Sequence, residues 1–201
     1  MTATARTSHV FDDKILQDAY KSEFESQLKI MKQKNLYTTY ENQNNCSENI
    51  VQTFLTNQNI ISIMVLALTQ SGKTGLIVEI INAFYNTINP VPKENIFIIT
   101  GLSDCDWKKQ TAKRVPSCLR ERVYHRNNLL GKRGFVSEIK NKKNILIIID
   151  ELQIAAKGNQ TIHRAFEETG LMNKENLLEN DVKIVQLTAT PDGGIYDHRQ
   201  W

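Results

Sequence analysis

Residues 60–74 read IISIMVLALTQSGKT. The stretch 60–68 is short, largely apolar at successive positions and rich in β-branched residues, which predicts a strand that is buried on both faces. A Gly-Lys-Thr turn follows, and the helical spacing of apolar residues begins near residues 73–86. Strand, turn and helix in this order are the context that a phosphate-binding loop requires.

Further apolar runs at 96–100, 145–149 and 183–187, with a short one near 122–125, alternate with helical patterns near 104–114, 134–142 and 161–168. This alternation predicts right-handed βαβ units, and therefore an α/β fold in which a doubly wound parallel sheet carries helices on both faces.

The first 49 residues have a different texture. Residues 1–10 indicate a loose tail, apolar residues at helical spacing predict one or two helices over about 12–34, and the polar stretch 38–49 predicts a linker. We therefore expect an N-terminal region over 1–49 and one domain over 50–201.

The composition excludes several classes of protein. With 40% hydrophobic residues among 201, the chain can form a core and is not a disordered sequence. A net charge of +3 permits contact with nucleic acid without demanding it. Three widely spaced cysteines, Cys46, Cys105 and Cys118, make a poor disulfide framework. No apolar signal-peptide region and no membrane-length run occurs, so we expect an intracellular protein, cytoplasmic or nuclear.

The Gly-Lys-Thr turn carries the clearest chemistry. Backbone N–H groups at such a turn converge on a phosphate, and the helix dipole adds positive potential. Lys73 would reach the β- and γ-phosphates of a nucleotide, and the Thr74 hydroxyl would bind Mg²⁺. The remaining loop residues expected at the phosphates are Thr69, Gln70, Ser71 and Gly72. Ala67 stands where the strict pattern has its first glycine, and the alternative is a helix start without a ligand.

Two further motifs follow apolar strands. Asp150 ends the run 145–149, where a buried carboxylate needs a partner such as a Mg²⁺ shared with Thr74. Glu151 would polarise an attacking water. Downstream, Thr188 and Thr190 flank an alanine at the end of the last strand, and their hydroxyls could bond Gln153. The alternatives are a solvated helix start at 150–151 and a plain strand exit at 188–191.

These three motifs, at 67–74, 150–153 and 187–191, resemble those of the first RecA-like domain of superfamily 2 helicases and translocases, over roughly residues 50–201. Their form is most similar to DEAD-like helicases of large DNA viruses and phages. The resemblance implies a P-loop NTPase fold and ATP hydrolysis, with Mg²⁺, coupled to movement along DNA or RNA or to its unwinding. It also implies residue roles: phosphate and Mg²⁺ binding by Lys73 and Thr74, Mg²⁺ binding by Asp150, base catalysis by Glu151, and coupling to strand separation by Thr188 and Thr190.

The sequence departs from this family in several places. Gln70 stands where a glycine is usual. Residues 103–110 replace the usual nucleic-acid-gripping motif, and Asp104 would repel a phosphate. Contact would then fall to Ser103, Thr100, Lys108 or Lys109, while Trp107 would stack on a base or pack in the core. An adenine-reading glutamine is expected upstream of the loop, and the candidates are Gln43 and Gln52. His125 and His163 have no partners at metal-ligand spacing.

The chain ends at Trp201, soon after the third motif. The resemblance calls for a second RecA-like domain, whose arginine completes the ATP site, and a missing arginine of this kind costs about 10³–10⁵ in turnover. We therefore expect this polypeptide to bind Mg-ATP weakly, hydrolyse it poorly and unwind nothing alone. Two alternatives remain: the ATPase domain of a viral DNA-packaging terminase, and a nucleotide-dependent binding module with the N-terminal helices as a docking surface.

Overall fold

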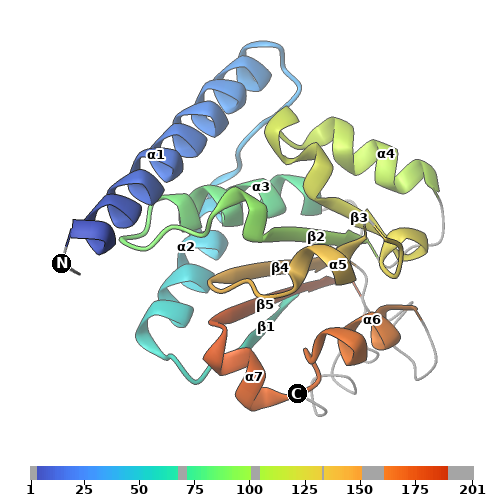
Figure 1. The fold of residues 1–201 in the computed structure, drawn as a ribbon. Helices are drawn as coiled ribbons and strands as arrows, with labels where there is room; N and C mark the ends of the chain where they lie inside the picture. Colours follow the sequence, from blue (N-terminus) through green and yellow to red (C-terminus); the bar gives the residue numbers. More distant parts are fainter. Residues whose placement is uncertain (1–3, 68–71, 101–104, 133, 151–160, 190–201) are drawn as a thin grey trace.

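The computed structural model describes residues 4–67, 72–100, 105–132, 134–150 and 161–189, without the side chains of residues 4–13 and 105–107. Five parallel strands form one sheet in the order β1-β5-β4-β2-β3 (Figure 1). The strands are β1 (Ser62–Leu66), β2 (Ile96–Thr100), β3 (Val123–His125), β4 (Ile145–Asp150) and β5 (Val182–Thr188). The predicted α/β fold with a parallel sheet is confirmed.

Helices cover both faces of the sheet, as predicted (Figure 1). One face carries α1 (Thr4–Gln33), α2 (Glu41–Thr56), α3 (Lys73–Tyr85) and α4 (Cys105–Arg114). The other carries α5 (Phe135–Ile139), α6 (Thr161–Thr169) and α7 (Lys174–Glu179). Short 3-10 turns complete the described chain: η1 (Lys93–Asn95), η2 (Ser117–Arg122) and η3 (Arg126–Asn128).

The strands are Ile-rich because they are buried from both sides. All six residues of β4 are buried, and its side chains alternate between the two cores. Leu146 and Ile148 pack on the α3 side, whereas Ile147 and Ile149 pack on the α6 side. This alternation follows from the two-residue period of a strand and explains the unbroken apolar run.

The N-terminal region differs from the expected tail and linker. Helix α1 already begins at Thr4, and α2 occupies most of the stretch 38–49. The buried side of α2 includes Gln43 and Ser47 beside Ile50, Val51 and Phe54. The buried positions in the first turns of α2 are polar, so a search for apolar residues at helical spacing does not detect this part of the helix. Within the described chain, no helix has the length and apolarity that crossing a membrane would require.

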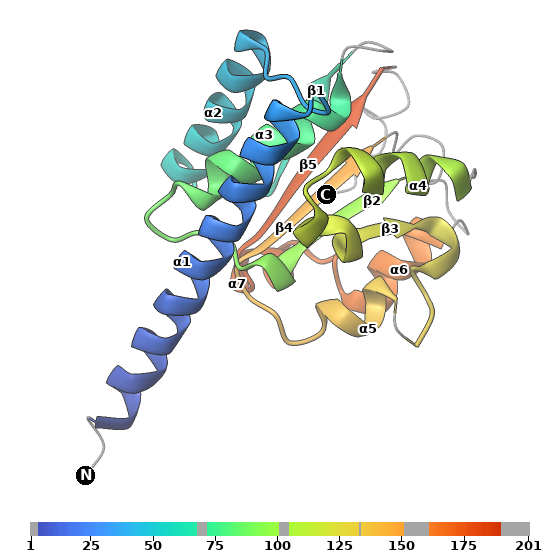
Figure 2. The same ribbon diagram turned by 90° about the horizontal axis from the view of Figure 1, so that it is seen from above.

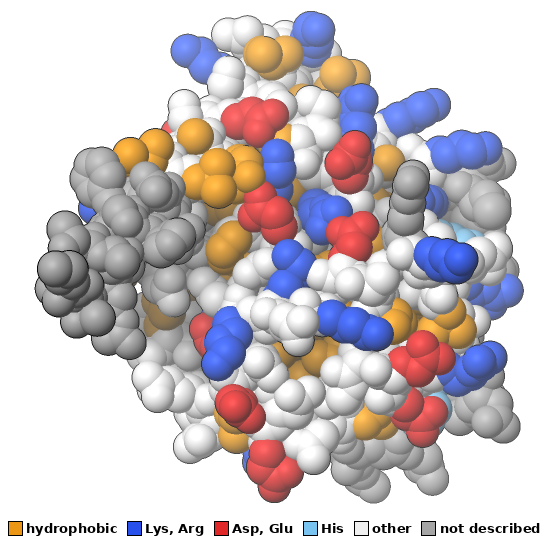
Figure 3. All heavy atoms as spheres, in the orientation of Figure 1, with side chains coloured by type: hydrophobic (Ala, Val, Ile, Leu, Met, Phe, Trp, Pro, Cys, Tyr) orange, Lys and Arg blue, Asp and Glu red, His pale blue; other side chains and the backbone are white. Residues whose placement is uncertain are grey.

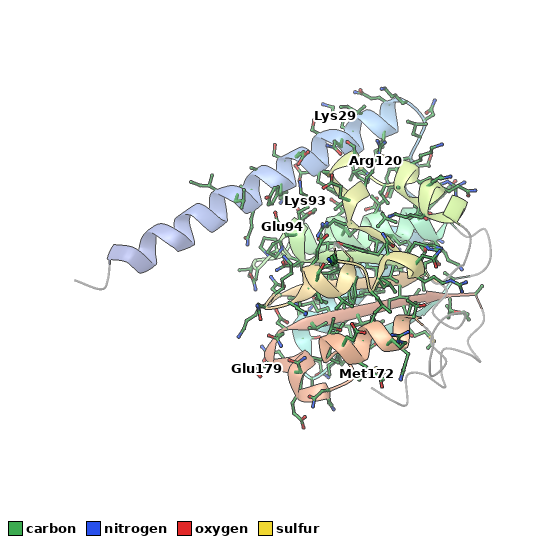
Figure 4. All side chains as sticks on the ribbon, turned by 45° about the vertical axis from the view of Figure 1, so that its right-hand side comes forward. Lys29, Lys93, Glu94, Arg120, Met172 and Glu179 are labelled. Carbon is green, nitrogen blue, oxygen red and sulfur yellow. The ribbon has the colours of Figure 1, made fainter. Side chains whose placement is uncertain are left out.

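Helix α1 packs against the domain through its second half, and its first half projects away from the body (Figure 2). The Phe24 ring meets the Tyr85 ring edge-on at 5.1 Å. Lys93 of η1 lies beside α1 (Figure 4), with its Nζ 3.5 Å from Glu23 Oε2 and 4.6 Å from the Tyr20 ring centroid. A hydrogen bond to Glu94, helped by burial, raises the pKa of Tyr20 to about 12.

Helices α2 and α3 run in the same direction. Near their N-termini the Gln43 side chain contacts Gly72, and near their C-termini the Phe54 and Phe84 rings lie 6.1 Å apart. Both helix N-termini therefore lie at the carboxyl end of β1. Helix N-termini carry partial positive charge, so this end of the sheet has two such ends close together.

Candidate functional site

The carboxyl ends of β1 and β4 bring together the lysine and the aspartate that the sequence singled out. Helix α3 begins at Lys73, as predicted, directly after Gly72, whose φ of +79° favours glycine. Lys73 Nζ lies 3.7 Å from Asp150 Oδ1, although 77 residues separate them in the chain. The predicted strand before the first motif, the helix at its end and the proximity of the second motif are thus all present.

This ion pair is well shielded from water. The side chain of Asp150 is 5% exposed and that of Lys73 is 12% exposed. Burying a carboxylate is costly without a compensating charge, and the lysine ammonium supplies that charge. Thr74 lies in the first turn of α3, so its hydroxyl and the Asp150 carboxylate are the oxygen ligands that would suit Mg²⁺. No cluster of three or more His, Cys, Asp or Glu side chains suited to a metal occurs in the described residues.

Strand β5 lies between β1 and β4 and carries Thr188 at its end. Leu187 pairs with Asp150 in register, and Thr188 pairs with Leu66. The Ala67 N–H donates a 2.8 Å hydrogen bond to the Thr188 carbonyl. The third motif thus begins on the strand that lies between those of the first and the second motifs. The other predicted residues lie outside the described part of the chain: Thr69, Gln70, Ser71, Glu151, Gln153 and Thr190.

Of the two candidate glutamines, the structure brings Gln43 to the loop. The Gln43 side chain is buried, and its Nε2 donates a 3.0 Å hydrogen bond to the Gly72 carbonyl. A Cβ at Gly75 would lie 3.1 Å from the same Gln43 amide, so a larger residue there would require the Gln43 side chain to shift. Gln52 is nine residues farther along α2, about 13 Å up the helix, and lines the groove between α2 and α3.

A buried carboxylate that sequence reasoning missed anchors the segment before α2. Glu79 is 5% exposed and accepts hydrogen bonds from the Tyr37 hydroxyl, from Thr39 Oγ1 at 3.0 Å and from Asn82 Nδ2 at 3.3 Å. Burial, together with the bond to Glu79, raises the pKa of Tyr37, so the hydroxyl remains a donor. The available signal was Glu79 itself, the one charged residue in the apolar run 76–81.

The residues considered for nucleic-acid contact or metal binding differ in how far they are buried. Thr100 and His125 are buried at strand ends, whereas His163 forms a 3.3 Å pair with Glu167 on α6. The burial of Thr100 does not favour its predicted contact with a nucleic-acid backbone. Lys108 is half-buried and Lys109 exposed on α4, while Ser103, Asp104 and the Trp107 side chain lie outside the described residues. On the face in Figure 3, Lys and Arg side chains are interspersed with Asp and Glu.

No protein-family model matches the sequence, and no curated protein is significantly similar to it.

Proposed function

We propose that residues 50–201 form the ATP-binding motor lobe of an ATP-dependent helicase or translocase that acts on DNA or RNA. The observation that carries the proposal is the 3.7 Å approach of Lys73 Nζ to Asp150 Oδ1 at the carboxyl end of a parallel sheet. Open α/β sheets bind ligands at this end of their strands. A lysine that opens a helix and an aspartate that ends a buried strand are the pair that a magnesium nucleotide requires.

Each residue of the candidate site would have a separate role in binding a nucleotide. The N–H groups at the start of α3 and the Lys73 ammonium would hold the phosphates, with Lys73 exchanging its carboxylate partner for a phosphate oxygen. Thr74 and Asp150 would hold Mg²⁺, which neutralises phosphate charge. Gln43 holds the Gly72 carbonyl, and therefore the end of the loop, in place. Glu151 follows Asp150 directly and is our candidate for activating water.

The order of the strands supports the motor class in particular. Thr188 stands at the end of the strand that separates β1 from β4, so a change at the phosphates can reach the sheet through the Ala67–Thr188 hydrogen bond. The LTATP sequence at 187–191, in the same chain as the other two motifs, favours a helicase or translocase over the packaging-terminase alternative. Nucleic-acid contacts would involve two of the lysines of α4, Lys108 and Lys109.

The test is coupling between nucleotide and nucleic acid. Fluorescence anisotropy of labelled single-stranded DNA and RNA oligonucleotides is measured with and without a magnesium complex of a non-hydrolysable ATP analogue. We expect the analogue to change the affinity for one of them by about fivefold or more, with the effect lost in Lys73→Ala. Affinity should also fall as salt rises. Oligonucleotide binding that is absent, or that ignores the nucleotide, contradicts the motor proposal.

A further inference from the structure

Three polar residues form a line across the carboxyl ends of β4, β2 and β3, which we name the polar row. Asp150 pairs in register with Thr100, and Thr100 pairs in register with His125. Residues two positions earlier in each strand pack in the core on the α3 side: Ile148, Ile98 and Val123. Because side chains alternate along a strand, the polar row faces that same side, where Lys73 meets Asp150.

Two members of the row are buried polar side chains. Thr100 is 0% exposed and His125 is 3% exposed. Neither Thr100 Oγ1 nor His125 Nε2 has a hydrogen-bond partner among the residues that the structure describes. Buried polar groups in folded proteins are nearly always satisfied, by protein or by ordered water. Each of these two atoms therefore calls for a partner at the strand ends.

The tautomer of His125 determines whether the partner of Nε2 must donate or accept a hydrogen bond. The Asn127 N–H donates a 3.2 Å hydrogen bond to His125 Nδ1, so the neutral imidazole carries its proton on Nε2 and is a donor there. The Thr100 hydroxyl can both donate and accept, and the Asp150 carboxylate accepts. Along the row from β3 to β4, a donor (His125) is therefore followed by a group that both donates and accepts (Thr100) and then by an acceptor (Asp150). Neighbouring strands lie about 4.8 Å apart, a spacing that one water molecule bridges.

We infer that Thr100 and His125 are positioning residues for the Asp150 carboxylate, which they hold through bridging water molecules. Water suits the row because it accepts from His125 and donates to Asp150, whereas an anion would be repelled by the carboxylate. The inference rests on the proposed function, in which Asp150 holds Mg²⁺. Hydrogen-bonded groups that orient a metal ligand typically change metal affinity 10–100-fold when they are removed.

The experiment measures the magnesium concentration that half-saturates binding of a fluorescent ATP analogue to the full chain. Thr100→Val keeps the shape of the side chain and removes the hydroxyl, and we expect it to raise that concentration about tenfold. Thr100→Ser restores the hydroxyl and should recover most of the loss. Thr111→Val removes the hydroxyl of a buried threonine on α4, outside the row, and controls for the general effect of the substitution. Thermal melts report whether each variant folds.

Two substitutions at His125 test the same inference independently. His125→Asn keeps an acceptor near Asn127 N–H and lacks the Nε2 donor, whereas His125→Gln keeps a donor near the Nε2 position. We expect the asparagine variant to need more magnesium than the glutamine variant. If Thr100→Val and His125→Asn both keep the wild-type requirement while Asp150→Asn raises it, the inference fails and the proposed function stands. If the wild-type chain shows no magnesium-dependent binding, both fail.

Discussion

Lys73 and Asp150 form an ion pair with 3.7 Å between Nζ and Oδ1, in which neither side chain is more than 12% exposed. One residue opens a helix and the other ends a strand, so the pair joins α3 to β4 at the carboxyl end of the sheet. In the free protein each charge compensates the other, and both are charges that a magnesium nucleotide would engage.

Removing one member of this pair should destabilise the fold. Lys73→Met leaves the Asp150 carboxylate without the ammonium, and we expect a loss of roughly 2–3 kcal/mol, below the value for a fully buried pair. Adding Asp150→Asn should restore part of that loss, because the uncompensated charge disappears. Urea unfolding of the wild type, both single variants and the double variant measures this coupling. Additive effects of the two substitutions would mean that the pair does not interact.

Because Gln43 donates a hydrogen bond to the Gly72 carbonyl, we expect its replacement to weaken Mg-ATP binding more than replacement of Gln52, which lies on the same helix. Gln43→Ala removes a hydrogen bond worth about 1 kcal/mol, so we expect roughly fivefold weaker Mg-ATP binding. Gln52→Ala is the matched control, because Gln52 is exposed and lines the α2–α3 groove. Isothermal titration calorimetry measures both. A larger effect at Gln52 than at Gln43 would overturn the assignment.

The Glu79 cluster predicts a stability effect outside the candidate site. Tyr37→Phe removes one donor from a buried carboxylate, and we expect the free energy of unfolding to fall by about 2 kcal/mol. Tyr40→Phe is the control, because the Tyr40 side chain is largely exposed. Urea unfolding monitored by circular dichroism gives both values. Equal stabilities of the two variants would contradict a structural role for the Tyr37 hydroxyl.

Alkaline pH should test the environment of Cys118. Burial, with the Glu23 carboxylate adding to it, raises the pKa of the Cys118 thiol from its ordinary value of 9.0 to about 11. The folded state therefore disfavours the thiolate, so this contribution to stability is complete below pH 9 and is lost as pH rises from 9 through 11. The stability of the wild type should fall more steeply over that range than that of Cys118→Ser, as measured by urea unfolding. Parallel pH profiles would contradict the assigned environment.

The sequence predicts the elements that local residue patterns determine. It does not predict the features that depend on contacts between residues far apart in the chain. The Ile-rich runs predict the strands of a parallel sheet, because residues buried on both faces must be apolar throughout. Helix α2 is missed because polar Gln43 and Ser47 form part of its buried side. The Glu79 cluster joins residues about forty positions apart. The alignment of Asp150, Thr100 and His125 depends on strand register, which no single strand encodes.

Calorimetric titration of the wild-type chain with ATP, in the presence and absence of Mg²⁺, tests the proposed nucleotide site. We predict magnesium-dependent binding that Lys73→Ala weakens roughly 10–100-fold, through the loss of charge-assisted bonds to phosphate. Lys93→Ala should bind as the wild type does, because Lys93 contacts α1 on another side of the domain. Magnesium-independent binding, or equal binding by Lys73→Ala and the wild type, would contradict a nucleotide site at the start of α3.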